Sequence, residues 1–343
     1  MSSPVSEFDL IRRYFSRPVP AGVLGPGDDC ALLPAAAGPW AISTDLLLAG
    51  RHFFADVDPA RLGHKALAVN LSDLAAMGAM PRGCVLGLAL PAIDPDWLAA
   101  FADGWYALAA QAQCPLVGGD TTRSESGLAI SVTVFGEITP AGPLRRDAAR
   151  VGDDIWVSGA LGAAHVALQL SLHQRGLARS GTDPLARWLA DLTPAQVDTW
   201  WQRTRDALEL PQPRLALGQA LAPLAHAALD ISDGLLQDLG HIVQASACAA
   251  LIQAPALPVG PLRGLPAAAA WQAALGGGDD YELCFTAAPA QRAAIAAAAQ
   301  RVQVPVRRIG HIVAGDPQVV VHDDRGHPWS PPLRGFDHFI AAS

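Results

Sequence analysis

The sequence predicts an α/β protein with layers of helices and sheets, organised as two domains. The chain of 343 residues is long for a single hydrophobic core. Apolar segments of strand length alternate with helical patterns as far as residue 138. A segment rich in proline, glycine and arginine, residues 139–152, then precedes a second series of such elements. We therefore expect domains at residues 1–145 and 146–343.

The first domain should contain four strands and two helices. Asp58 and Asp94 are each followed by proline, a combination that favours the start of a helix. Helices should cover one face of the sheet, and a partner sheet should cover the other. The expected elements are a strand at 40–43 ending at Thr44 and Asp45, a helix at 58–78, a strand at 84–90, a helix from 94, a short strand at 115–117 leading to a GGD turn, and a strand at 128–138.

The second domain should begin with a strand and a turn of small residues. The alanine-rich segment 287–299 is strongly helix-forming, so it is interpreted as an ordinary helix rather than a linker. The expected elements are a strand at 155–157, a turn at 158–162, a helix from 233 to about 246, a strand at 281–286, a helix from about 289 to 301 and a strand at 319–322.

Composition excludes several classes of protein. The formal net charge of -8 argues against a nucleic-acid binder, which needs basic surface to displace counterions. The sequence has no apolar run of the length that a membrane span needs and no secretion signal at its amino terminus, so a cytoplasmic protein is expected. The five cysteines lack CxxC spacing and the ten histidines lack an HExxH motif, so neither a disulfide framework nor a common zinc site is indicated.

Aspartates recur in short polar or glycine-rich motifs between apolar segments. Such carboxylates suit divalent cations that hold phosphates. Each motif also has an ordinary interpretation, as a surface turn, a helix cap or, for Asp73, an ion pair with Lys65. The sequence has no GxxxxGK[ST] loop and no kinase catalytic-loop signature. The motifs are GPGDD at 25–29, STD at 43–45, NLSD at 70–73, GGD at 118–120, DISDG at 230–234 and GGGDD at 276–280.

In order and spacing, these motifs resemble the thiamine-monophosphate kinase family. The likeness is carried by GPGDDCALL, ISTDLLLAGRHF, KALAVNLSDLAAMGAMPRG, GGDTTR, DISDGLLQDLGHI and GGGDDYELCFT, and it extends to the terminal GFDHF. The resemblance implies the fold of aminoimidazole ribonucleotide synthetase, shared with selenophosphate synthetase. It further implies a homodimer in which the amino-terminal sheets pair, an amino-terminal domain for ATP, magnesium and dimerisation, and a carboxyl-terminal domain that completes the active-site cleft.

The resemblance implies the last step of thiamine diphosphate biosynthesis, in which ATP phosphorylates thiamine monophosphate with the help of several magnesium ions. No catalytic protein nucleophile is expected, because the acceptor is already an anionic phosphate oxygen. The implied magnesium ligands are Asp29, Ser43, Thr44, Asp45, Asp73, Asp120, Asp230 and Asp233. The implied ATP contacts are Gly119, Asp120, Arg146, Ser232 and Tyr106, and the implied substrate contacts are His52, Asp279 and Phe336.

This chain departs from the family pattern at three positions. Asp279 stands where the family usually has glutamate, Leu46 stands where threonine is common, and Pro26 replaces a branched apolar residue. The shorter carboxylate of Asp279 bears on its substrate contact, whereas the other two changes remove no carboxylate. Two rival functions are a synthetase of the same fold, against which the apolar surroundings of Cys30 argue, and a silent nucleotide- or metal-binding protein.

Overall fold

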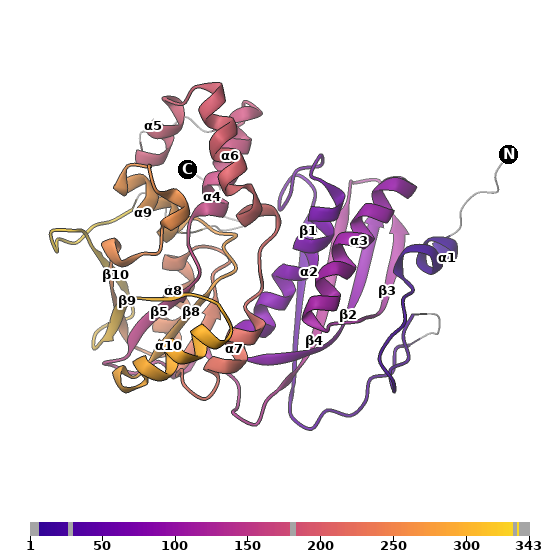
Figure 1. The fold of residues 1–343 in the computed structure, drawn as a ribbon, viewed down its shortest axis with the longest axis horizontal. Helices are drawn as coiled ribbons and strands as arrows, with labels where there is room; N and C mark the ends of the chain where they lie inside the picture. The colour runs from indigo at the N-terminus through magenta and orange to yellow at the C-terminus, as the bar shows by residue number, and fades with distance from the viewer. Residues whose placement is uncertain (1–6, 27–29, 179–182, 332–334, 336–343) are drawn as a thin grey trace. The chain divides into compact units, whose positions relative to one another are not determined.

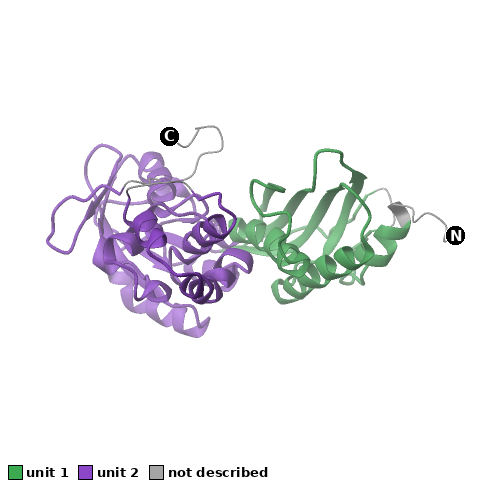
Figure 2. Ribbon diagram, turned by 90° about the horizontal axis from the view of Figure 1, so that it is seen from above, with its two compact units in different colours: residues 1–74, 79–140 green, residues 75–78, 141–343 purple. Residues whose placement is uncertain are grey.

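The computed structural model describes residues 7–26, 30–178, 183–331 and 335. The chain divides into two compact units, one formed by Met1–Leu74 and Ala79–Pro140 and the other by Ala75–Gly78 and Ala141–Ser343 (Figure 2). The predicted boundary between residues 145 and 146, with the roles assigned to the two domains, stays a prediction. Among the described residues, no helix has the length and apolar character needed to cross a lipid bilayer.

Unit 1 is a four-stranded sheet with two long helices (Figure 1). The strand order is β1-β4-β2-β3, in which β4 is antiparallel to both β1 and β2, and β3 is parallel to β2. Its elements are α1 (Glu7–Leu10), a π-helical turn (Ile11–Phe15), β1 (Trp40–Leu48), α2 (Pro59–Ala76), β2 (Ala79–Leu90), α3 (Pro95–Ala112), β3 (Leu116–Arg123) and β4 (Ala129–Ile138).

Three strands of unit 1 are longer than the sequence predicts, and β2 begins at Ala79 rather than at residue 84 because its first residues pair with β4. β1 continues beyond Thr44 and Asp45 to Leu48, because β4 pairs with it along its whole length. The predicted turn at Gly118–Asp120 lies inside β3, where these residues pair with β2. The prediction that these aspartates end their strands is therefore wrong, since pairing with a neighbouring strand overrides the local preference of glycine and aspartate for turns.

The helices α2 and α3 pack closely against each other through glycines. A Cβ atom on Gly63 would lie 2.1 Å from the carbonyl oxygen of Phe101, and one on Gly104 would lie 1.8 Å from that of Ala60. The side chains of Phe101 and Trp105 are fully buried beside this contact. These helices cover one face of the sheet, so the residues of β1 on that face are less exposed than those between them.

Unit 2 is a six-stranded sheet with helices on both faces (Figure 1). The strand order is β10-β7-β9-β5-β8-β6, and only the pair of β10 and β7 is parallel. Its strands are β5 (Asp154–Ser158), β6 (Ala227–Asp230), β7 (Ala249–Gln253), β8 (Leu283–Ala287), β9 (Val306–Val313) and β10 (Val319–His322). Its helices are α4 (Ala163–Gln174), α5 (Pro184–Ala190), α6 (Pro194–Glu209), α7 (Leu215–Leu221), α8 (Leu235–Ala245), α9 (Ala267–Gly276) and α10 (Arg292–Arg301).

The strand β8 is the centre of the core of unit 2. Cys284 packs with residues of α8 and α9 on one face, whereas Phe285 packs with residues of α7 and α10 on the other. All five residues of β8 are buried, as a strand covered on both faces requires. The sequence predicts β5, α8, β8, α10 and β10 to within a few residues. It does not predict α4 to α7, β6, β7, α9 or β9.

Candidate functional site

In unit 1, the helix-covered face of β1 brings Ser43 and Asp45 beside the carboxyl-terminal part of α2. The hydroxyl of Ser43 donates a hydrogen bond to Oδ2 of Asp73 at 2.5 Å. The backbone N–H of Asp45 donates to Oδ1 of Asn70 at 3.0 Å. Because side chains two residues apart on a strand share a face, one helical turn meets both strand positions. We call Ser43, Asp45, Asn70 and Asp73 the β1–α2 cluster.

The β1–α2 cluster concentrates negative charge in a partly buried place. Burial and the neighbouring carboxylate of Asp73 raise the pKa of Asp45 to about 6. Two carboxylates that disfavour each other's charge, with hydroxyl and amide oxygens next to them, form a donor set that suits a hard divalent cation. Within the described ranges, no three His, Cys, Asp or Glu side chains are grouped as a metal site requires.

Thr44 and Asp120 lie on the opposite face of this sheet. The hydroxyl of Thr44 is 2.7 Å from that of Thr133. Across the strands, Asp120 is aligned with Gly87, Ser131 and Leu46. Side chains in this row point to the face opposite to that of Asp45, because Leu46 and Asp45 are neighbours on one strand. Asp120 also lies on the far edge strand, at about three strand spacings or 14 Å from β1. The structure therefore does not bring these two side chains to the β1–α2 cluster, and their ligand roles stay predictions.

Three further predicted positions in unit 1 have distinct surroundings. Gly119 adopts a φ of +154°, and a Cβ there would lie 2.0 Å from the carbonyl oxygen of Leu86. His52 follows β1 in a turn, where its Nδ1 accepts a hydrogen bond from the N–H of Leu48 at 2.9 Å. Tyr106 lies on α3, where its ring centroid is 5.2 Å from the guanidinium of Arg17, and burial raises the pKa of its phenol.

In unit 2, the loop after β6 carries Asp230, Ser232 and Asp233 into the start of α8. Asp238, one turn into the helix, folds back on this loop. Its Oδ2 accepts hydrogen bonds from the N–H groups of Ser232, Asp233 and Gly234 at 3.1, 3.1 and 3.0 Å. Burial, together with the charges of Asp230 and Asp233, raises the pKa of Asp238 to about 8. We call residues 230–234 the DISDG loop.

Asp238 is a residue that sequence reasoning missed. It is buried, and it fixes three consecutive backbone groups of the DISDG loop. The available signal was its spacing, because an acidic side chain in the first turn of a helix can accept bonds from N–H groups at the helix start.

The predicted ATP contact Arg146 is exposed in the short 3-10 segment Arg146–Ala148, where its carbonyl oxygen accepts a hydrogen bond from Ser246.

A second loop, residues 276–281, runs directly beside the DISDG loop. The N–H of Asp279 donates to the carbonyl oxygen of Ser232, and the N–H of Tyr281 donates to that of Ile231, both at 2.8 Å. The structure therefore brings Asp279 next to Ser232. The sequence does not reveal this proximity, because the two residues belong to separate motifs. Asp279 and Tyr281 adopt left-handed backbone conformations with φ of +65° and +48°. Such conformations in non-glycine residues are held by their surroundings and are frequent at functional sites.

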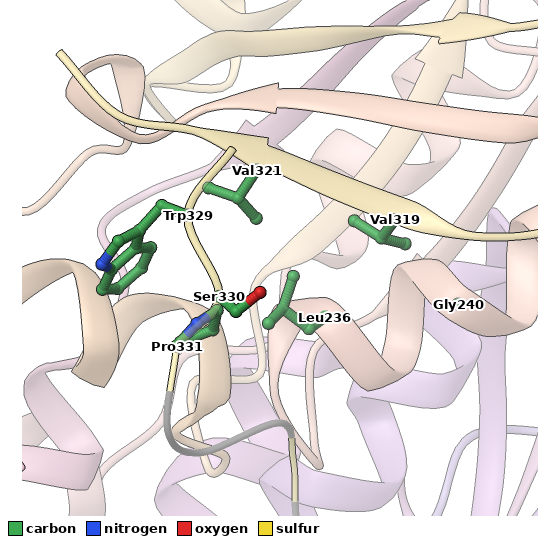
Figure 3. Close-up of a pocket in the computed structure, with 7 residues that line it drawn as sticks. All are labelled: Leu236, Gly240, Val319, Val321, Trp329, Ser330 and Pro331. Carbon is green, nitrogen blue, oxygen red and sulfur yellow. The ribbon is translucent and has the colours of Figure 1, made fainter. Parts of the chain in front are cut away.

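Unit 2 also contains a cavity of about 240 Å³ between α8 and β10 (Figure 3). Val319 and Val321 point from β10 toward Leu236 of α8, and Trp329 also lines the cavity. Trp329 packs edge-on against Trp271, with ring centroids 5.9 Å apart. No motif of the sequence predicted this cavity. The predicted site residues Asp29 and Phe336, like Gly27 and Asp28, lie outside the described residues.

Comparison with known proteins gives two family matches that together cover most of the chain. Residues 27–138 match the family "AIR synthase related protein, N-terminal domain". Residues 150–323 match "AIR synthase related protein, C-terminal domain". The predicted fold, two α/β domains like those of aminoimidazole ribonucleotide synthetase, is confirmed by these matches.

Individual relatives resemble the chain over nearly its whole length. A thiamine-monophosphate kinase of Salmonella typhimurium is 42% identical over 339 residues, which covers 97% of this chain and 98% of the relative. The crystal structure of a thiamine-monophosphate kinase from Stenotrophomonas maltophilia is 45% identical, with a TM-score of 0.75, and the match covers 90% of this chain and 92% of that one. A structure of AaThiL complexed with AMPPCP and TMP is 28% identical, with a TM-score of 0.68, and covers 88% and 87% of the two chains.

Proposed function

The chain belongs to the thiamine-monophosphate kinase family, and from this premise we propose that it transfers the γ-phosphoryl group of ATP to thiamine monophosphate, giving thiamine diphosphate and ADP. The observation that carries the proposal is the 42% identity to a thiamine-monophosphate kinase along 97% of this chain and 98% of that relative. The complex of AaThiL with AMPPCP and TMP supports the same pair of substrate classes. This reaction would be the last step of thiamine diphosphate biosynthesis, and we expect it in the cytoplasm.

Magnesium would be held by the oxygen donors that the sequence predicts. The β1–α2 cluster fits a divalent cation, because burial and the charge of Asp73 both disfavour ionisation of Asp45 unless a positive charge is near. Burial, together with the charges of Asp230 and Asp233, raises the pKa of Asp238 in the same way, so the DISDG loop offers a second donor set in unit 2. We propose Ser43, Asp45, Asp73, Asp230 and Asp233 as ligands on this physical ground, and Asp29, Thr44 and Asp120 on the family resemblance alone.

The reaction needs positioning more than it needs a reactive protein group. The acceptor is a phosphate oxygen that is already anionic, so direct in-line transfer requires neither a protein nucleophile nor a strong base. Bound magnesium supplies neutralisation of the phosphate charges of the two substrates. We propose that Gly119, Arg146, Ser232 and Tyr106 position ATP. His52, Asp279 and Phe336 would position thiamine monophosphate.

We further propose that the protein is a homodimer formed through the sheet of unit 1. On the face of β1 away from the helices, Trp40, Ile42, Leu46 and Leu48 are all exposed, and Ile42 is 62% exposed. Met80 of β2 is exposed as well. A row of large apolar side chains along an edge strand is an interaction surface rather than an ordinary solvent face. A second copy of the same sheet would cover it.

Phosphorus NMR of the purified protein tests the proposed reaction. ATP and magnesium are supplied with and without thiamine monophosphate, and the spectra are followed for a new diphosphate ester together with ADP. The proposal expects both products only when the acceptor is present. ATP that stays intact in the presence of folded protein, magnesium and acceptor would refute it. ADP formed without acceptor, or only with the acceptor of a related synthetase, would refute the substrate assignment.

A further inference from the structure

His165 lies beside the predicted substrate residue Asp279, although no sequence motif includes it. It occupies the first turn of α4, which begins at Ala163. The loop 276–281 meets His165 at Gly277. A Cβ atom built on Gly277 would lie 2.4 Å from Cβ and 2.6 Å from Cγ of His165. The imidazole therefore starts directly against the backbone of the loop that carries Asp279.

The start of α4 is fixed to this loop from a second side. Both carboxylate oxygens of Asp280 accept hydrogen bonds from the N–H of Gly162, at 3.0 and 2.9 Å. Gly162 has a φ of +82°, and a Cβ there would lie 2.7 Å from the nitrogen of Ala274, so the turn has no room for a side chain. The backbone position of His165 relative to Asp279 is therefore determined by contacts on both sides of the helix start.

The electrostatics keep the His165 imidazole neutral. Burial lowers its pKa to about 4, although the charges of Asp279 and Asp183 both act to raise it. A neutral imidazole has one N–H donor and one nitrogen acceptor. Among the described residues, neither ring nitrogen of His165 forms a hydrogen bond, and the residue keeps some solvent exposure. The ring therefore offers polar atoms that a ligand can use.

Asp279 is held from its other side by Tyr281. The phenol of Tyr281 donates a hydrogen bond to Oδ1 of Asp279 at 3.2 Å. Both residues have left-handed backbone conformations, and both backbone N–H groups are bonded to the DISDG loop. A carboxylate one methylene shorter than the glutamate usual in the family is thus kept in a defined place, with a phenol and a neutral imidazole as its neighbours.

We propose that His165 is a specificity-determining residue that contacts the heteroaromatic part of the acceptor beside Asp279, with Tyr281 as a residue that positions Asp279. The inference rests on the proposed function. The acceptor joins a cationic heteroaromatic group to a phosphate, and a carboxylate next to a neutral ring attracts such a cation. A protonated histidine at this position would repel it. The neutral ring can also exchange a hydrogen bond with the acceptor's ring nitrogens or amino group.

Steady-state kinetics of His165→Ala and His165→Gln test this role. Removing one hydrogen-bonding contact should raise KM for thiamine monophosphate by about 10-fold in His165→Ala. KM for ATP and kcat should stay within about twofold, because His165 does not contact ATP in this proposal. His165→Gln keeps a donor and an acceptor, so it should recover most of the loss. His173→Ala, an exposed position of the same helix, should behave as the wild type.

Three outcomes would overturn the inference while leaving the proposed reaction intact. They are an unchanged KM for thiamine monophosphate in His165→Ala, a parallel rise of both KM values, and a His165→Gln variant as impaired as the alanine variant. Calorimetric titration of folded His165→Gln with thiamine monophosphate alone measures binding directly, so that a folding defect is not mistaken for a loss of binding. A wild-type protein that forms no thiamine diphosphate would instead refute the proposed function.

Discussion

At the residue scale, carboxylates paired with arginine differ from Asp45 and Asp238 in the direction of their pKa shifts. The guanidinium groups of Arg292 and Arg308 lower the pKa of Asp154, and that of Arg82 lowers the pKa of Glu137. Asp45 and Asp238 show the opposite shift, because burial and neighbouring carboxylates disfavour their charged forms. Groups of like charge that are kept close together are typical of sites that bind a cation.

Replacing Asp45 by asparagine should separate activity from stability. The change removes a charge that burial and Asp73 disfavour, so the free energy of unfolding without metal should stay equal or rise by up to about 1 kcal/mol. Phosphoryl transfer should fall by about 100-fold or more, because a proposed metal ligand is lost. Urea unfolding in EDTA and ADP production measure the two effects. Asp103→Asn, an exposed position on α3, is the control and should change neither; an active Asp45→Asn protein would contradict the ligand assignment.

His165 should make the protein lose stability in mild acid. Its pKa is about 4 in the folded state and 6.5 in the unfolded reference, so the unfolded chain binds more protons between these values. The stabilising effect is complete above pH 6.5 and is lost as the pH falls toward 4. From pH 7 to pH 5, the wild type should lose about 2 kcal/mol more unfolding free energy than His165→Gln. Equal losses in urea titrations at the two pH values would contradict the lowered pKa of His165.

At the element scale, the packing of α2 on α3 depends on glycine. A Cβ on Gly104 would lie 1.8 Å from a backbone oxygen, and a backbone atom cannot move away as the end of a side chain can. The apolar stripe on α3 predicts a buried helix from the sequence, but the stripe does not reveal that Gly63 and Gly104 face the other helix. That information appears only when both helices are placed on the sheet.

Gly104→Ala should destabilise the protein by about 3 kcal/mol, because α2 and α3 must separate to admit a methyl group. Gly240→Ala is a matched control inside helix α8, where no atom lies within 4 Å of the added Cβ. That change should stabilise by about 0.5 to 1 kcal/mol, as expected for alanine in place of glycine in a helix. Urea unfolding measures both. Similar values for the two variants would contradict the close contact of α2 with α3.

At the scale of the whole molecule, the proposed homodimer makes the exposed face of β1 functional. Ile42→Glu places a charge in the apolar row and should convert the dimer to a monomer, since burying an unpaired carboxylate at an interface is costly. Leu177→Glu is the control, because Leu177 is 61% exposed in unit 2 and Ile42 is 62% exposed in unit 1. Sedimentation velocity gives the mass of each. A wild-type monomer, or a dimer that survives Ile42→Glu, would refute the proposed interface.

The family was accessible from the sequence, because six motifs in fixed order need no tertiary structure to be compared. The resemblance to thiamine-monophosphate kinases is confirmed by relatives that match along nearly the whole chain. The fold class was accessible for a related reason: alternation of apolar and polar residues follows the geometry of each strand or helix, and that geometry is local. The ligand and substrate assignments stay predictions, because a motif names residue types without placing them.

Only the tertiary structure decided which of these residues meet. Ser43 and Asp45 lie on one face of β1 with Asp73, whereas Thr44 points to the other face. All three residues lie inside a strand that continues to Leu48, because β4 pairs with β1 along its whole length. His165 and Asp279 are 114 positions apart in the printed numbering, yet they meet through Gly277, so no local pattern could join them. Sequence determines local periodicity and motif chemistry. Contacts between distant segments depend on how the whole core packs, which no short stretch of residues specifies.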